Sequence, residues 1–193
     1  MEREQQLHPI VEAAGLRGEL PPWARCGNGR YAHAGRVATL LVSWAEVLAL
    51  PETERTRWRA AGFLHDALKD GSPDELLGLA GPGWPGPVLH APACAERLRG
   101  DGVDDDEMLL AIAYHPVGHP DFAALGEYLF MADFLDPGRR FLESERAKLR
   151  DRLPEERREV LLAVLAYRME KLLRRRQALL PASLRLWNRV VAS

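Results

Sequence analysis

The chain has 193 residues, of which 47% are apolar and 28% are charged, so it can bury a sizeable core and wholesale disorder is excluded. Its 26 Lys and Arg residues nearly balance its 28 Asp and Glu residues, and the formal net charge of -2 argues against a generally basic nucleic-acid binder. The two cysteines, Cys26 and Cys94, lie outside any CxxC motif, which excludes a disulfide scaffold and a thiolate zinc site.

Targeting and membrane signals are also missing from the sequence. No apolar run approaches the roughly 20 residues that cross a membrane. The first ten residues, MEREQQLHPI, are charged and lack the apolar stretch of a secretory signal. We therefore expect a cytoplasmic protein that does not associate with membranes.

The first half of the chain has the pattern of helices joined by short turns. Residues 30–49 carry apolar side chains at steps of three and four, which predicts one helical face, and Pro51 ends that helix. A second helix is expected over 52–69, because acidic residues open it and Gly71 closes it. Ser72 is the expected N-cap of a short helix that reaches about Leu79.

The second half continues this pattern. Residues 81–87, GPGWPGP, are expected to be a loop that is neither helix nor strand. Helices are predicted at 88–99, at 105–115, at 122–136, within 143–178 with a break at Pro154, and at 181–192. Sustained apolar and polar alternation is missing, so no strands are expected. The prediction is an all-α single domain over 1–193, with a core at about 28–140 and C-terminal helices at about 143–192 packed on it.

Histidine and aspartate residues recur on the apolar helices. They are His33, His65, Asp66, His90, His115 and Asp133. Asp133 lies within LFMADFLD, where an ionised carboxylate is costly to bury unless a metal ion or a cation compensates it. An ion pair with an arginine explains Asp133 about as well as a metal does. A lone helical histidine is also more often an ordinary hydrogen-bonded residue than a ligand, so only the whole set favours a metal site.

Several helices must pack around one centre to assemble such a site, because no two of these residues form a local HExxH pair. Adjacent helical residues point about 100° apart, so His65 and Asp66 can diverge and Asp66 can bridge two ions. Imidazole and carboxylate ligands without thiolate suit iron, manganese, zinc or magnesium.

The ordered series H…HD…H…H…D on an all-α chain resembles the HD-domain metal-dependent phosphohydrolase superfamily. The local sequences are similar to those of the YqeK-type branch, the symmetrical diadenosine tetraphosphate hydrolases, and cover most of the chain. The matching segments are RYAHAGRVA (30–38), AAGFLHDALKD (60–70), LHAPACAERL (89–98), DEMLLAIAYHPVG (106–118), YLFMADFLDPGRR (128–140) and LLPASLRLWN (179–188).

This resemblance implies an HD-domain helical bundle with a dinuclear metal site between its core helices. One ion would be held by His33, His65, Asp66 and Asp133. Asp66 would bridge to a second ion on His90 and His115. Two divalent metal ions are expected, and iron is the expected metal, with manganese, zinc, magnesium and cobalt as alternatives.

Residues around the ligand set are expected to contact the substrate. The resemblance implies that Lys69 takes part in catalysis with Asp66 and faces the substrate phosphates, and that Arg139 clamps a phosphate. Arg36 is expected either to contact phosphate or to form a salt bridge. His119, in the loop HPVGHPD, is a candidate substrate contact or late ligand, although it can equally have no role in the site.

Three positions depart from the family pattern. The family motif His-Thr-x-Gly is His115-Pro116-Val117-Gly118 here, so a hydroxyl near the second metal is missing. Asp136 replaces a glutamate, and His119 replaces what is more often an arginine. The ligand set stays intact, but the exact substrate is left open.

The function implied by the resemblance is cleavage of diadenosine tetraphosphate to two ADP by a metal-activated water. The alternatives are a related enzyme acting on nucleoside monophosphates or cyclic dinucleotides, a diiron oxygenase of the HD type, and a non-catalytic nucleotide-binding module. The partner is thus a small nucleotide and no nucleic acid is expected. The basic run 172–180 is expected to be a solvated helix face. An apolar stripe on 158–192 fits either a homodimer or packing within one chain.

Overall fold

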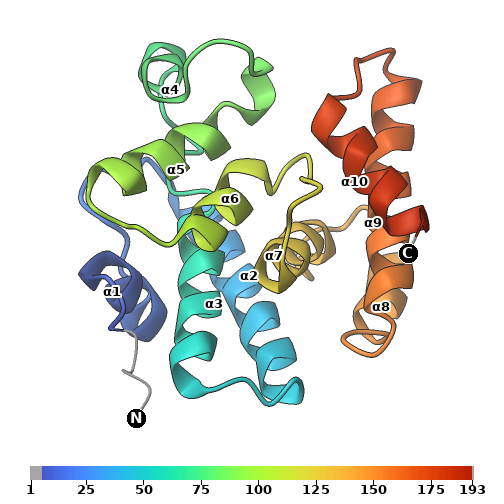
Figure 1. Ribbon diagram of the computed structural model, residues 1–193, viewed down its shortest axis with the longest axis horizontal. Coiled ribbons are helices and arrows are strands. Elements are labelled where there is room, and N and C mark those ends of the chain that lie inside the picture. Colours follow the sequence, from blue (N-terminus) through green and yellow to red (C-terminus); the bar gives the residue numbers. More distant parts are fainter. Residues whose placement is uncertain (1–5, 193) are drawn as a thin grey trace.

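The computed structural model describes residues 6–192, which form ten α-helices and one short 3-10 helix, with no strand in that range (Figure 1). This confirms the all-α prediction. The charged residues 1–5 of the expected domain, and Ser193, lie outside the described residues. None of the described helices combines the length and the apolar character that crossing a membrane requires.

The helices follow one another in chain order. They are α1 (Pro9–Arg17), α2 (Asn28–Val47), α3 (Glu52–Leu64), α4 (Pro73–Ala80), the 3-10 helix η1 (Gly86–Val88), α5 (His90–Gly100), α6 (Asp106–Tyr114), α7 (Ala124–Leu135), α8 (Glu143–Arg150), α9 (Arg157–Arg174) and α10 (Pro181–Ala192). Ser72 accepts a hydrogen bond from the backbone N–H of Glu75 at 3.2 Å, so it is the N-cap of α4, as predicted.

The second predicted helix is shorter than expected. The sequence pattern extends it to residue 69, but α3 ends at Leu64 and residues 65–70 form successive turns. The physical reason is a competing backbone pairing, because Arg25 donates to the carbonyl of Ala67 at 2.7 Å and accepts from the N–H of Asp70 at 2.9 Å. His65 and Asp66 therefore lie in tight turns just beyond the helix, not within it.

Two further differences concern short elements. The helix α1 was not predicted, and it begins where Nδ1 of His8 accepts a hydrogen bond from the N–H of Ile10 at 3.3 Å. The loop expected over 81–87 is partly regular, because the N–H of Val88 donates to the carbonyl of Pro85 at 3.0 Å and starts η1. Both elements are short, and a local cap at His8 explains α1 better than apolar periodicity does.

Small residues let α2 and α3 pack closely. A Cβ atom added at Gly62 would lie 2.5 Å from Cα of Ala38, so only glycine permits this approach. Large buried side chains fill the space between these two helices and α7, with Leu41 on α2, Trp58 on α3 and Tyr128 on α7. This packing brings His33 on α2 to a ring-centroid distance of 5.3 Å from His65, just beyond α3.

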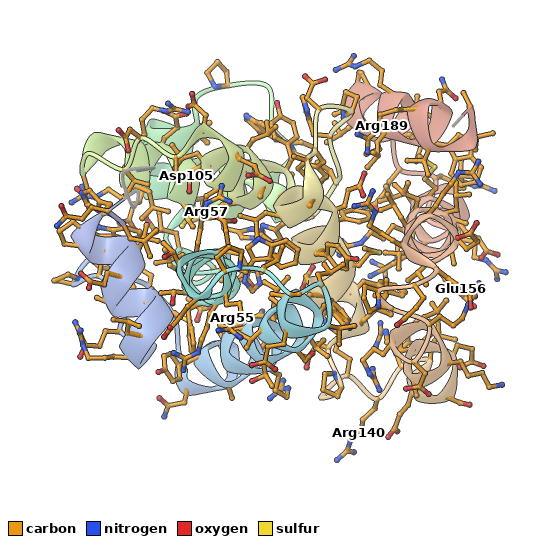
Figure 2. All side chains as sticks on the ribbon, turned by 60° about the horizontal axis from the view of Figure 1, so that its bottom comes forward. Arg55, Arg57, Asp105, Arg140, Glu156 and Arg189 are labelled. Carbon is orange, nitrogen blue, oxygen red and sulfur yellow. The ribbon has the colours of Figure 1, made fainter. Side chains whose placement is uncertain are left out.

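A partly buried ion pair joins α3 to the start of α6 (Figure 2). The guanidinium of Arg57 contacts both carboxylate oxygens of Asp105, at 2.5 and 2.7 Å. Asp105 also accepts a hydrogen bond from the N–H of Met108 at 3.0 Å, which caps α6. The pair thus fixes the helix that ends beside His115.

The C-terminal helices α8, α9 and α10 lie on the side of α7 away from α1 (Figure 1). Arg189 on α10 donates to Glu127 on α7 at 2.5 Å, and the hydroxyl of Ser183 donates to the carbonyl of Val117 at 2.7 Å. These contacts tie the last third of the chain to the core, and the single-domain organisation over 1–193 stays a prediction.

Candidate metal centre

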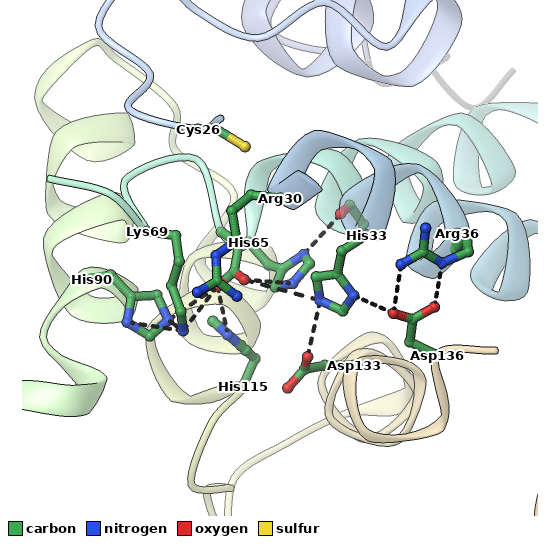
Figure 3. A network of polar contacts seen from close by, with 12 residues as sticks. Cys26, Arg30, His33, Arg36, His65, Lys69, His90, His115, Asp133 and Asp136 are labelled. Atoms are coloured by element: carbon green, nitrogen blue, oxygen red, sulfur yellow. Dashed lines mark hydrogen bonds and ion pairs between the residues drawn. The ribbon is translucent and has the colours of Figure 1, made fainter. Parts of the chain in front are cut away.

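The carboxylate of Asp66 lies at the centre of four imidazoles. Its Oδ2 atom is 4.0 Å from Nε2 of His33 and 3.7 Å from Nε2 of His65. Its Oδ1 atom is 3.1 Å from Nε2 of His90 and 3.4 Å from Nε2 of His115. Each oxygen therefore faces a different pair of histidines, and Figure 3 shows His90 and His115 to the left of His33.

Backbone carbonyls orient two of these rings. Nδ1–H of His65 donates to the carbonyl of Gly62, and Nδ1–H of His115 donates to that of Ile112, both at 2.8 Å. A histidine that donates from Nδ1 leaves the lone pair of Nε2 for a metal ion. The tight turn after α3 therefore presents Nε2 of His65 towards Asp66.

Unsatisfied polar atoms at this centre fit a metal ion. Nε2 of His65 and Oδ1 of Asp66 are fully buried and form no hydrogen bond within the described part of the chain. Two sets of ligand atoms lie close enough together for a shared ion, namely those of His33, His65 and Asp133 and those of His65, Asp66 and His115. All of these side chains are buried, and buried polar groups without partners are otherwise costly.

The protonation states favour metal binding by His65 and Asp66. Burial lowers the pKa of His65 to about 3, so the ring is neutral at pH 7. Burial alone would raise the pKa of Asp66, but the surrounding imidazoles of His65, His115 and His90 outweigh it and hold the pKa well below its usual range. Neutral imidazole and ionised carboxylate are the forms that coordinate metals.

Lys69 lies on the His90 side of the centre. Its ammonium donates to Nε2 of His90 at 2.8 Å and is 3.5 Å from Oδ1 of Asp66 (Figure 3). A cationic group thus already stands between two of the expected ligands of the second ion. Burial lowers the pKa of His90, so the ring accepts this hydrogen bond in its neutral form.

Asp133 contacts several cations. Its Oδ1 atom is 3.1 Å from Nε2 of His33 and 2.5 Å from Nη2 of Arg139, and its Oδ2 atom accepts from Arg168 at 2.8 Å. The ion pair with arginine that the sequence left open is therefore present. A substrate phosphate bound by Arg139, as the sequence predicts, would have to share the guanidinium with Asp133.

Asp136 is a site residue whose contacts sequence reasoning missed. Only 1% exposed, it accepts from Nδ1–H of His33 at 2.7 Å and binds the guanidinium of Arg36 through two contacts, at 2.6 and 3.0 Å. Of the two roles expected for Arg36, the structure shows the salt bridge. The spacing of Asp133 and Asp136 by three residues was the available signal, because the helix expected over 122–136 would place both on one side, although α7 ends at Leu135.

Arg168 was also missed, and no signal near it in the sequence pointed to the site. It lies on α9, far from Asp133 along the chain.

His119, in contrast, contacts no expected ligand in residues 6–192. Its ring packs on Tyr114 at a centroid distance of 4.3 Å, and Trp84 packs on the same Tyr114 at 5.0 Å. His119 and Trp84 therefore contact Tyr114, the residue before His115, and not the ligand set itself.

Comparison with known proteins agrees with this site. Residues 30–175 match the family model described as HD domain. A crystal structure from Clostridium acetobutylicum, of a predicted HD superfamily hydrolase involved in NAD metabolism, aligns with a TM-score of 0.74 and 24% identity over 86% of this chain and 90% of that one. At that identity the alignment supports the fold alone.

Curated relatives are more similar to this chain, but over shorter segments. A protein named "Bis(5'-nucleosyl)-tetraphosphatase, symmetrical" from Staphylococcus aureus is 30% identical over 119 residues, which are 57% of this chain and 60% of the relative. A protein of the same name from Halalkalibacterium halodurans is 30% identical over 105 residues, 54% of this chain and 55% of the relative. The chain therefore spans between half and two thirds of the length of these relatives. The comparisons confirm the resemblance to the HD-domain family that the order of His and Asp residues predicted.

Proposed function

Because the chain belongs to the HD domain family, we propose that it is a metal-dependent phosphohydrolase that cleaves dinucleoside polyphosphates, with diadenosine tetraphosphate as the substrate. The observation that carries this proposal is the carboxylate of Asp66, whose two oxygens face two different pairs of imidazoles. The names of the curated relatives support the choice of substrate. His33, His65, Asp66 and Asp133 would hold one ion, and Asp66, His90 and His115 the other.

Divalent ions bound there would act as Lewis acids and lower the pKa of a water ligand towards about 7. The water oxygen would bond to one inner phosphorus of the tetraphosphate chain, and the bond from that phosphorus to the central bridging oxygen would break. One dinucleotide and one water then give two ADP molecules and protons. Iron is the proposed native metal, with manganese, zinc, magnesium and cobalt as alternatives.

The protein side chains would supply charge and orientation. Lys69, 3.5 Å from Asp66, places a mobile ammonium where phosphate oxygens would approach the carboxylate. Its hydrogen bond to His90 would be exchanged for a phosphate oxygen, and this charge would stabilise the transferring phosphoryl group. Arg139 has a side chain 42% exposed, so its unused donors remain open to a second phosphate.

A substrate panel tests this proposal. The purified protein would be analysed for metal content and then offered diadenosine tetraphosphate, a nucleoside monophosphate and a cyclic dinucleotide, with detection of ADP and phosphate. ADP as the sole product from the tetraphosphate supports the proposal, whereas turnover of either other substrate alone supports the related-enzyme alternative. Protein without stoichiometric metal would contradict a metal enzyme.

An Asp66→Ala variant tests the central carboxylate. We expect it to lose both bound metal and turnover, because the bridging oxygens are removed. The matched control is Asp104→Ala, an exposed aspartate outside the site. Full activity of Asp66→Ala would overturn the mechanism. The apolar stripe on 158–192 fits either a homodimer or packing within one chain, and a homodimer would show as twice the chain mass in light scattering.

A further inference from the structure

A basic cavity adjoins the candidate metal centre on the α9 side. It has a volume of about 800 Å³ and lies between the segment 133–146 and residues 167–175 of α9 and its end. Asp133 lines both this cavity and the metal centre. Seven of the thirteen lining residues are Arg or Lys, and two are acidic. The sequence predicted a solvated helix face for part of this region, but the fold gathers its cations around a concave surface.

The acids of the cavity do not balance its cations. Asp133 binds Arg139 and Arg168, and Glu170 pairs with Arg174 at 2.7 Å. The other four cations form no ion pair with any residue in 6–192. They are Arg140, Arg146, Lys171 and Arg175. Partial burial of its ammonium is the largest cause that lowers the pKa of Lys171, and the nearby Arg175, Arg168, Arg139 and Arg146 lower it further.

Arg146 is the strongest sign of an anionic ligand. It is only 5% exposed, its Nε atom has no hydrogen-bond partner, and its Nη1 atom reaches only the carbonyl of Arg139, at 3.5 Å. The guanidinium lies over the ring of Phe134 at 4.7 Å, and this cation–π contact holds its plane in place. A buried guanidinium without a carboxylate is costly, so an anion that enters the cavity would supply the missing partner.

Aromatic rings line the same cavity. Tyr167 stacks on Phe134 at a centroid distance of 5.8 Å, with 24° between the ring planes. Phe141 is 70% exposed although it lines the cavity, and its ring lies 5.7 Å from the guanidinium of Arg146. An exposed flat ring beside unpaired cations matches a molecule that carries both phosphates and an aromatic base. Cavities of about 300–1,000 Å³ are typical for ligands of that size.

We propose that this cavity binds one nucleoside diphosphate arm of the substrate, with its phosphates on Arg146 and Lys171 and its base against Phe141. The substrate assignment rests on the proposed hydrolysis. The scissile bond then lies at the metal centre, and the other arm extends towards Lys69. The cavity becomes a determinant of substrate choice, because a phosphate ester without a second phosphate arm would leave Arg146 and Lys171 without an anionic partner.

Binding of ADP, measured by calorimetry on the purified protein, tests the proposal. Lys171→Gln and Arg146→Met are each expected to weaken ADP binding about tenfold, which corresponds to about 1.4 kcal/mol. The matched control is Lys148→Gln, since Lys148 is an exposed lysine on α8 that does not line the cavity. It is expected to bind ADP like the unmodified chain. Because Lys171 is exposed, its replacement should not affect folding.

Pyrophosphate separates a nucleotide site from a simple anion site. Phe141→Ala should weaken ADP binding and leave pyrophosphate binding unchanged. The proposal is overturned by unchanged ADP affinity in both cavity variants, by an equal loss in Lys148→Gln, or by an equal loss of both ligands in Phe141→Ala.

Failure of the proposed hydrolysis gives a different pattern. If diadenosine tetraphosphate is not cleaved but ADP binding still depends on Lys171 and Arg146, the nucleotide subsite stands and the hydrolase assignment falls. If the tetraphosphate is cleaved with an unchanged KM in both variants, the subsite falls alone.

Discussion

Nδ1–H of His33 donates a hydrogen bond to Asp136 at 2.7 Å, while Nε2 of the same ring faces Asp133 at 3.1 Å. Burial opposes ionisation of His33, but the hydrogen bonds to Asp133 and Asp136 outweigh it and raise its pKa to about 9, so a metal ion that binds Nε2 would displace the proton that faces Asp133. Arg36 binds the same carboxylate, and together these contacts hold the pKa of Asp136 below its usual range despite burial. Asp136 is therefore a positioning residue that aims Nε2 of His33 into the centre.

Asp136→Asn tests this positioning role. We expect metal affinity to fall about 10- to 100-fold, the usual cost of losing a group that orients a metal-binding histidine. Asp136→Glu should keep most of the affinity, because it retains the carboxylate. Competition with a fluorescent chelator measures the affinity of each variant. Equal affinity of Asp136→Asn and the unmodified chain would show that Asp136 only stabilises the fold.

Lys69→Gln should separate catalysis from metal binding. Because the ammonium would stabilise charge on the transferring phosphoryl group, we expect kcat to fall about 100-fold. Metal content should stay unchanged, since Lys69 is a neighbour of the ligands and not one of them. Elemental analysis and steady-state kinetics on one preparation give both values. Loss of metal from this variant would mean that Lys69 holds His90 in place.

The Arg57–Asp105 pair makes stability depend on pH. Burial alone would raise the pKa of Asp105, but Arg57 and the N–H of Met108 outweigh it and lower the pKa. The ionised carboxylate is thus favoured by folding, and its contribution is complete above the ordinary pKa of about 3.9 and is lost as the pH falls through the lower folded value.

Asp105→Asn removes this charge and keeps a capping side chain. We expect it to reduce the free energy of unfolding by about 1.5–3 kcal/mol at pH 7, the range for hydrogen bonds to charged groups. The difference from the unmodified chain should shrink between pH 4 and pH 2, as a value of roughly 3.9 for the free carboxyl requires. Urea unfolding at several pH values measures it. A difference that does not depend on pH would point to altered packing.

Gly62→Ala tests the close contact of α2 and α3. The added Cβ would lie 2.5 Å from Cα of Ala38, and because both partners are helix backbone, the helices must separate. We expect a loss of about 1–3 kcal/mol in the free energy of unfolding. The control is Gly78→Ala on α4, where an added Cβ would meet no atom within 4 Å beyond its own helix backbone. This change should raise the free energy of unfolding by up to about 1 kcal/mol. Thermal unfolding of the two variants should therefore shift in opposite directions.

Much of the fold was predictable from local patterns. The helix at 181–192 and the cap at Ser72 follow from proline and serine chemistry, which acts within a few residues. The end of α3 did not follow, because it depends on a backbone pairing between residues 67–70 and Arg25. Such a pairing joins distant segments and leaves no periodic signal.

The ligand residues of the candidate centre could be predicted from their residue types and their order along the chain, because a buried histidine or aspartate needs a polar or charged partner in any fold. Their partners did not. Arg168 reaches Asp133 from α9, and Asp136 is shared between His33 and Arg36. The amino-acid sequence alone thus determined which side chains must meet a cation. Only the packing of α2, α3, α7 and α9 decided which atoms face one another, since those distances arise between helices and not within them.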